Sequence, residues 1–200
     1  MKRVVFLIFA VGLLTTTICS GQSVMTMTTS SNKVQFYLSG SGTFTIDWGD
    51  GSESETHTLL EQKYCFDDKY AFRHNYSDTS AHTIKITGDS ITHLRCSFNQ
   101  LTSLDISKNA ALTWLDCSNN RLKSLDASKN TKLKTLWCEN NNQLTSFKAS
   151  SALIELRGIP YLRVLEKETV TDNNGIIDIS NNFGMEYDIK EWMFDPFVKP

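Results

Sequence analysis

From Ile91 onward, the apolar and polar positions of the chain follow a fixed period. Segments of ten and eleven residues alternate, each opening with leucine or isoleucine and carrying a leucine three positions later: "ITHLRCSFNQ", "LTSLDISKNAA", "LTWLDCSNNR" and "LKSLDASKNTK". Two such halves form a unit of 21 residues, which is the interval between Cys96 and Cys117 (117 − 96) and between Cys117 and Cys138 (138 − 117). A unit this short cannot bury its apolar side alone, so the period predicts stacked coils in a solenoid.

Each half is expected to contain one short strand. We call the strands of the ten-residue halves the first edge and those of the eleven-residue halves the second edge. Leu115 and Cys117 are two positions apart and therefore point to the same side of a strand. Asn120 follows at the bend, where an inward amide can bond backbone groups that a turn leaves unpaired. The sequence thus predicts a coil with two strand edges, an asparagine ladder and little or no helix. The inward positions are Leu94, Cys96, Asn99, Leu115, Cys117, Asn120, Leu136, Cys138 and Asn141 on the first edge, and Leu104, Ile106, Asn109, Leu125, Ala127 and Asn130 on the second.

The region before the repeats has a different pattern. "KVQFYLSG", "TFTIDWGDG" and "HTIKITG" alternate apolar and polar residues with period two, and turn residues separate them. The pair Asp50-Gly51 is a tight hairpin signal, because glycine accepts a positive φ. We therefore expect a small antiparallel β-sandwich over residues 22–88, which meets the repeats of residues 89–152 at Gly88 with almost no linker.

Residues 153–200 are expected to form a C-terminal cap, because the open end of a solenoid must be covered. Within them, "IIDISNN" (residues 176–182) matches "WLDCSNN" and suggests a last coil after an insertion. The apolar tail "EWMFDPFV" (residues 191–198) would cover the last coil, or would serve as a docking segment.

The first 21 residues have the pattern of a signal peptide. A basic start, Met1-Lys2-Arg3, is followed by a short apolar run and by small and polar residues up to Gly21. Lipid attachment at Cys19 is the alternative to simple cleavage. No later apolar run is long enough to span a membrane. We therefore expect an exported protein, secreted or attached to the outer cell surface.

Composition and motifs narrow the classes of function. The net charge of −2 and the pI of about 6.1 argue against an electrostatic nucleic-acid binder. The sequence contains no H-E-x-x-H, no G-x-S-x-G and no phosphate-binding loop. We accordingly expect no enzymatic activity and no cofactor.

Four cysteines follow the leader: Cys65, Cys96, Cys117 and Cys138. Thiols that stand 21 residues apart form a line rather than converging on one ion, so a zinc site is not expected. Disulfides remain an alternative, because neighbouring coils lie within bridging distance. The interpretation we favour is a column of reduced, buried thiols that fill the core.

Two pairs of acidic residues and one histidine are assigned structural roles. Asp105 and Asp126 are expected to be solvated surface acids of the second edge rather than calcium ligands. Asp47 and Asp50 are expected to stabilise a turn through hydrogen bonds. His74, two positions before Tyr76, is expected to be structural.

The outward positions distinguish the two edges. Those of the second edge repeat serine, whereas those of the first edge vary and include two tryptophans, a residue type favoured at interfaces. We therefore place a ligand-binding face on the first edge; the alternative is that the tryptophans pack under a loop or the N-terminal region. The candidate binding residues are His93, Arg95, Phe98, Trp114, Asp116, Arg121, Trp137 and Glu139.

Two resemblances accompany these patterns. "TIDWGDGS", "FRHNYSD" and "HTIKITG" resemble the polycystic-kidney-disease (PKD) repeat, an immunoglobulin-like sandwich, and "LTSLDISKNAALTWLDCSNNRL" is similar to leucine-rich surface proteins of Bacteroidetes-like bacteria. The resemblances imply a mainly β protein, with a small PKD-like sandwich followed by a short leucine-rich-repeat solenoid. They also imply non-catalytic binding or adhesion to a protein or glycan at the bacterial surface. A structural spacer or assembly module is the alternative.

Overall fold

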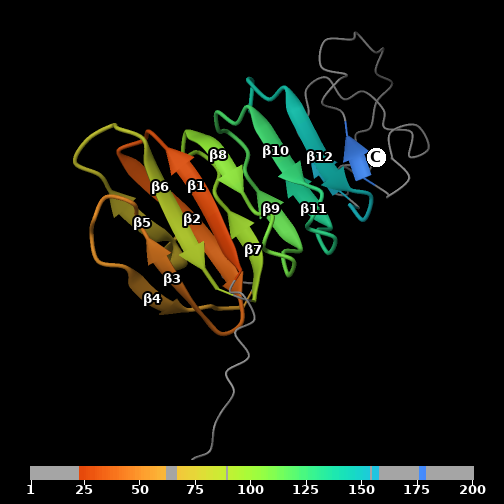
Figure 1. Cartoon of the computed structure of the whole chain (residues 1–200). Helices are drawn as coiled ribbons and strands as arrows, with labels where there is room; N and C mark the ends of the chain where they lie inside the picture. The colour runs from red at the N-terminus through yellow and green to blue at the C-terminus, as the bar shows by residue number, and fades with distance from the viewer. Residues whose placement is uncertain (1–22, 62–66, 89, 154, 158–175, 179–200) are drawn as a thin grey trace, which may run out of the picture.

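The computed structural model describes residues 23–61, 67–88, 90–153, 155–157 and 176–178. These residues form a mainly β structure in which the N-terminal strands lead directly into a row of stacked coils (Figure 1). The helical segment among them is the short 3-10 turn η2 (Asp68–Tyr70). The expected leader (residues 1–21), Cys65 and the apolar tail (residues 191–198) lie outside the described residues.

The N-terminal strands form two layers. One layer has the order β4-β3-β6-β1, and the other contains β2 and β5, all in antiparallel pairs. The strands are β1 (Val24–Thr29), β2 (Lys33–Gly40), β3 (Thr43–Asp47), β4 (Glu55–Thr58), β5 (Phe72–Asn75) and β6 (His82–Thr87).

Both layers continue into the repeats without a break. β1 pairs antiparallel with β8 (Leu101–Asp105), and β2 pairs antiparallel with β7 (Ile91–Arg95). The results are a five-stranded sheet, β4-β3-β6-β1-β8, and a six-stranded sheet, β13-β11-β9-β7-β2-β5. The sequence pattern changes at residue 88, where a domain boundary was expected. In the structure, however, both sheets and a single hydrophobic core run across this position.

The turn of "WGDG" is fixed by its own carboxylates and by an aromatic stack. Asp47 Oδ1 accepts from the Gly49 N–H (2.9 Å), and Asp50 Oδ1 accepts from the Ser52 N–H (3.0 Å), as expected for turn-stabilising acids. The His74 ring stacks on Trp48 (centroids 4.6 Å apart) and its Nε2 lies 2.7 Å from Asp50 Oδ2. These contacts confirm a structural role for His74. The relationship of this region to PKD repeats stays a prediction.

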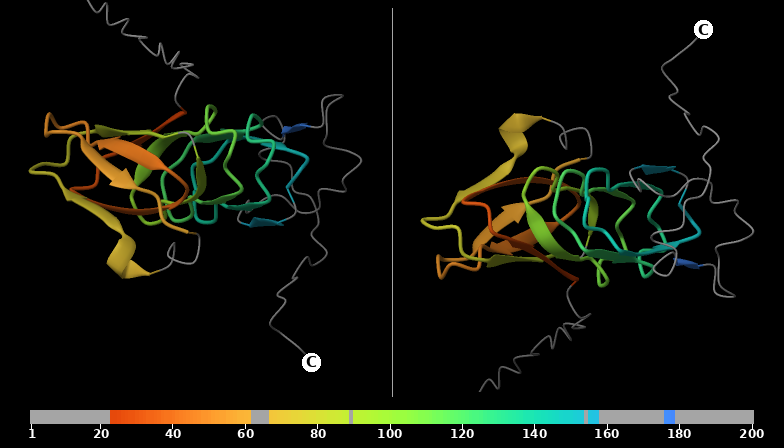
Figure 2. Two further views of the ribbon diagram at one scale, coloured as in Figure 1. Left: turned by 90° about the horizontal axis from the view of Figure 1, so that it is seen from below. Right: turned by 90° about the horizontal axis from the view of Figure 1, so that it is seen from above.

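The coils have two edges with parallel strands, which lie on opposite sides of the stack in Figure 2. The first edge consists of β7, β9 (Trp114–Asp116), β11 (Thr135–Trp137) and β13 (Glu155–Arg157). The second edge contains β8, β10 (Ser124–Ala127) and β12 (Ser146–Ser150), of which β10 and β12 pair in parallel. The predicted leucine and cysteine columns are buried between the edges.

The expected asparagine ladder is present on the first edge. Asn120 Oδ1 accepts from the N–H groups of Asn99 and Leu101, both at 3.0 Å. Its Nδ2 donates to the carbonyls of Cys96 and Cys117, at 3.0 and 2.9 Å. The amides of Asn120 and Asn141 thus each join two coils.

The thiols of Cys96, Cys117 and Cys138 are free and buried, which confirms the core interpretation for these three and makes the disulfide alternative wrong for them. Burial raises the pKa of all three thiols, that of Cys138 to about 12. A thiol of this kind stays protonated at neutral pH and acts as a small apolar side chain.

At the far end, β14 (Ile176–Asp178) contradicts the expected last coil. A further coil would place this segment parallel to β13, but it runs antiparallel to β12 on the second edge. The apolar alternation of residues 176–178 resembles the repeat, but this strand does not continue the parallel strands of the first edge.

Candidate functional site

The outward positions of the first edge form a continuous surface, because the strands pair in register. One row contains His93, Trp114, Thr135 and Glu155, and the next contains Arg95, Asp116, Trp137 and Arg157. Tyr37 of β2 extends the second row beside Arg95. We call this surface the first-edge face.

An aromatic cluster occupies the middle of the first-edge face. The half-buried rings of Trp114 and Trp137 meet edge to face, with centroids 5.2 Å apart and planes 70° apart. His93 lies against Trp114 (6.2 Å, 26°), and the Arg157 guanidinium lies 4.8 Å from the Trp137 ring. The rings thus contact each other and their described neighbours on the same face.

The electrostatics of the cluster suit a desolvated contact. Trp137 Nε1 donates to Glu155 Oε1 (3.2 Å), and Arg157 Nε donates to the same oxygen (2.7 Å). Burial lowers the pKa of His93, so that this ring is neutral at neutral pH. The polar groups of Trp137, Glu155 and Arg157 are therefore already paired, which reduces the free-energy cost of removing water from them when a partner covers the cluster.

Asp116 is a correction to the expected site. Its exposed fraction is 4%, because the carboxylate folds back on its own turn and accepts from the Ser118 N–H (3.0 Å) and the Ser118 hydroxyl (2.6 Å). Its Oδ2 also lies 3.5 Å from Arg95 Nε. Asp116 therefore positions Arg95 and is not itself an exposed contact residue.

The same turn recurs on the second edge. Asp105 and Asp126 each accept from the N–H two residues later, of Ser107 and Ser128, at 2.9 Å. Both acids are exposed as expected, but this bond was not expected. The repeated sequence motif D-x-S could have predicted it, because an aspartate side chain often accepts a hydrogen bond from the backbone N–H two residues later.

Three of the expected residues lie on the turns beyond the strands. Arg121 is exposed and Glu139 is half-buried. Phe98 has an exposed fraction of 73% and a left-handed backbone with φ of 61°. Asn119 and Asn140 occupy the same turn position in the next two coils, with φ of 54° and 56°.

Several residues of this region were not anticipated. Glu155 and Arg157 were assigned to the cap, although the apolar Leu156 between them pairs with Leu136 and continues the leucine column. Tyr37 was not anticipated because its pairing with Arg95 joins distant segments. Its hydroxyl donates to Asp68, and the Arg95 guanidinium lies 5.2 Å from its ring.

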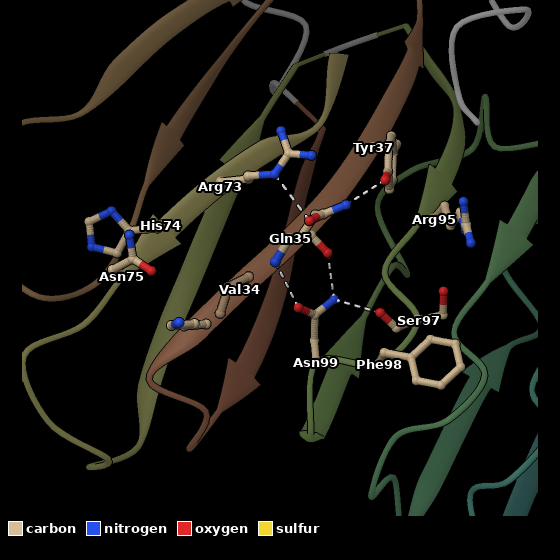
Figure 3. A pocket seen from close by; sticks show the side chains of 11 residues that line it. Val34, Gln35, Tyr37, Arg73, His74, Asn75, Arg95, Ser97, Phe98 and Asn99 are labelled. Carbon is tan, nitrogen blue, oxygen red and sulfur yellow. Dashed lines mark hydrogen bonds between the residues drawn. The ribbon is translucent and has the colours of Figure 1, made fainter. Parts of the chain in front are cut away.

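A pocket of about 380 Å³ lies where the N-terminal layers meet the first coil (Figure 3). Asn99 fixes this junction, since its Oδ1 accepts from the Gln35 N–H (2.8 Å) and its Nδ2 donates to the Gln35 carbonyl (2.7 Å). The pocket is lined by Lys33, Val34, Gln35, Tyr37, Arg73, His74, Asn75, Arg95, Ser97, Phe98 and Asn99.

Within the described parts of the chain, no group of His, Cys, Asp and Glu side chains is placed to hold a metal ion. A search of the same residues finds no helix with the length and apolar character needed to cross a membrane.

Comparison with known proteins identifies the repeats. A family model described as leucine-rich repeats, in two copies, matches residues 110–155. No curated protein and no solved structure matches the chain. The matched residues include β9 to β12 of the stacked coils. Leucine-rich repeats commonly mediate protein–protein interactions. The match and the parallel two-edged coils together support the assignment of residues 110–155 as leucine-rich repeats.

Proposed function

We propose that this protein is a non-catalytic binding protein whose first-edge face recognises a protein ligand. The observation that carries the proposal is the half-buried pair Trp114 and Trp137, flanked by His93 and Arg157 on four paired strands. Tryptophan and arginine dominate the central contacts of protein interfaces, where they lose their remaining water on binding.

The angle between the rings favours a protein ligand over a glycan. Planes 70° apart do not form one flat platform on which a sugar ring would stack. They form an irregular apolar surface, which side chains of a partner can match. A glycan ligand of the same face, which the sequence also suggested, is therefore the second choice.

The place of action belongs to the same proposal. The leader-like segment of residues 1–21 supports export, with the protein secreted or held at the outer surface of a bacterial cell by lipid at Cys19. Cell fractionation and the mass of the mature protein distinguish the two. An unprocessed chain in the cytoplasm would contradict export.

A binding array of matrix proteins and glycans identifies the ligand, and two variants then test the face. Trp114→Ala and Trp137→Ala are each expected to weaken binding of the identified protein roughly thirtyfold or more. Ser103→Ala and Ser124→Ala, on exposed positions of the second edge, are the matched controls and should leave the affinity unchanged.

Unchanged affinity of both tryptophan variants, with thermal unfolding like that of the wild type, would contradict the assignment of the face. A protein that binds nothing on the array but self-associates in sedimentation would instead support the structural spacer or assembly role, especially if truncation of residues 191–200 abolishes the association.

A further inference from the structure

We propose that the pocket at the junction of the N-terminal layers and the first coil is a second binding site, which takes an acidic saccharide. In the proposed arrangement the sugar ring lies on Phe98 and its carboxylate is held by the cationic side chains of the pocket. Figure 3 shows the side chains that line it. The site shares Tyr37 and Arg95 with the first-edge face but does not include the aromatic cluster.

Phe98 is the first observation. The equivalent turn position in the next coils is asparagine, a residue that tolerates a left-handed backbone, whereas a bulky aromatic residue there is strained. The Asn140 amide also donates to Asn119 Oδ1 (2.9 Å), a bond that phenylalanine cannot continue. The first coil thus replaces a favourable residue by one that is strained and highly exposed, which is typical of a binding residue.

The cationic side chains of the pocket are the second observation. Arg73, Arg95 and Lys33 bring three cationic side chains to the wall, and the residues that line the pocket include no carboxylate. Lys33 is exposed at the start of β2 and has no ion pair with a described residue. Figure 3 shows Arg73 and Gln35 on the sandwich side, and Phe98 beside Arg95 and Ser97 on the repeat side.

This donor set already holds one carboxylate of the protein itself. Asp68 does not line the pocket, but its Oδ1 accepts from the hydroxyl of Tyr37 and from Gln35 Nε2 (3.2 Å), and lies 3.8 Å from Arg73 Nη2. The Tyr37 hydrogen bond holds the pKa of Asp68 below its usual range. These side chains therefore already bind one ionised carboxylate in the protein itself.

The shape favours a saccharide over an acidic peptide. The volume of about 380 Å³ is near the lower end of small-molecule sites, which span about 300–1,000 Å³. A uronic acid or sialic acid residue presents a flat C–H face to an aromatic ring and a carboxylate at its edge. A glutamate or aspartate side chain offers the carboxylate on a flexible stem, without a face that would cover Phe98.

Calorimetric titration of the full chain with trigalacturonate and with 3′-sialyllactose tests the proposal. We expect at least one of them to bind, whereas the methyl ester of trigalacturonate and neutral lactose do not. Phe98→Asn, Arg73→Gln and Lys33→Gln should each weaken the binding roughly tenfold.

Two controls separate binding at this site from general charge attraction and from binding at the aromatic cluster of the first-edge face. Lys108→Gln removes one exposed charge on the second edge, and Trp114→Ala alters the aromatic cluster. Neither variant should change the affinity for the acidic saccharide. The proposed saccharide site and the proposed protein-binding role of the aromatic cluster can therefore be tested separately.

Three results would overturn the proposal. They are no binding of either acidic saccharide, equal binding of the neutral counterparts, and an affinity that Phe98→Asn leaves unchanged. Equal competition by a short polyglutamate peptide would also overturn it, in favour of an acidic peptide.

Discussion

The two edges of the solenoid have the same interior plan but different exteriors. Both place a leucine, a small or medium apolar residue and an asparagine inward, except at β12, where Phe147 takes the place of leucine and no asparagine follows. Outward, the first edge carries His93, Trp114, Trp137 and Arg157, whereas the second edge exposes serine, threonine, lysine and aspartate. Since both exteriors accompany the same type of coil, the aromatic residues are not required by the fold. The contrast is therefore the main argument for a function on the first edge.

The interiors also differ in one respect, the hydrogen bonding of the asparagines. Asn120 and Asn141 bridge coils through both amide atoms. On the second edge, Asn130 donates to the Ile106 and Asn109 carbonyls (both 2.9 Å), but the side-chain amide of Asn109 has no hydrogen bond with the described residues. The first edge is accordingly the more strongly cross-linked of the two.

At neutral pH, the largest effect is expected from removing a ladder amide. Asn120→Ala should lower the free energy of unfolding by about 3 kcal/mol, because it leaves buried N–H and C=O groups of two coils unpaired. Asn109→Ala is the matched change on the second edge and should cost less than about 1 kcal/mol. Urea unfolding of both variants measures the difference. Equal losses would show that the two ladders are equivalent.

A second effect appears only at alkaline pH, because thiols occupy the first edge whereas Ile106, Ala127 and Ala149 occupy the second. Burial raises the folded-state pKa of the thiols, so the folded chain retains protons that the unfolded chain loses above about pH 8.5. The free energy of unfolding should therefore be unaffected by the thiols below that pH. It should then fall by up to about 1.4 kcal/mol per pH unit for each thiol until the folded-state pKa is reached.

Cys117→Ala isolates the contribution of one thiol. Burial also raises the pKa of Tyr76 to about 12, but this tyrosine is present in both proteins, so its effect on stability cancels in the comparison. Alanine already occupies the corresponding position of the second edge at Ala127. The stability curves of wild type and variant should converge between pH 8.5 and 11. Parallel curves would show that the Cys117 thiol ionises as readily when folded.

The smallest effect should be a gain. Phe98→Asn restores the residue type of Asn119 and Asn140 at a left-handed turn and should raise the free energy of unfolding by about 1 kcal/mol. The reverse change, Asn119→Phe, should lower it by a similar amount. Thermal unfolding checks both. A destabilised Phe98→Asn variant would mean that the ring contributes more to folding than to binding.

The interior of the repeats could be predicted because it depends on a local period. The spacing of Leu115, Cys117 and Asn120 was sufficient for the buried columns and the ladder. The burial of Asp116 could not be predicted from the alternation alone, because an outward side chain can still bend back and bond its own turn.

Features made by distant segments were harder to predict. The pairing of β2 with β7 joins residues more than 50 positions apart, and it creates both the shared sheet and the junction pocket. The direction of β14 likewise depends on chain reversal and not on its own apolar pattern. Sequence alternation identifies the strands but not their partners.

The hydrogen bonds of Asn99 to Gln35 distinguish the first coil from the coils that follow. Since Asn99 and β7 carry the attachment to β2, whole units of 21 residues could be gained or lost farther along without changing that attachment. Each unit would lengthen the molecule by one strand spacing, about 4.8 Å, while keeping the same thickness. Duplication of repeat units would therefore change the length of the solenoid in fixed steps, while its junction with the N-terminal layers stays the same.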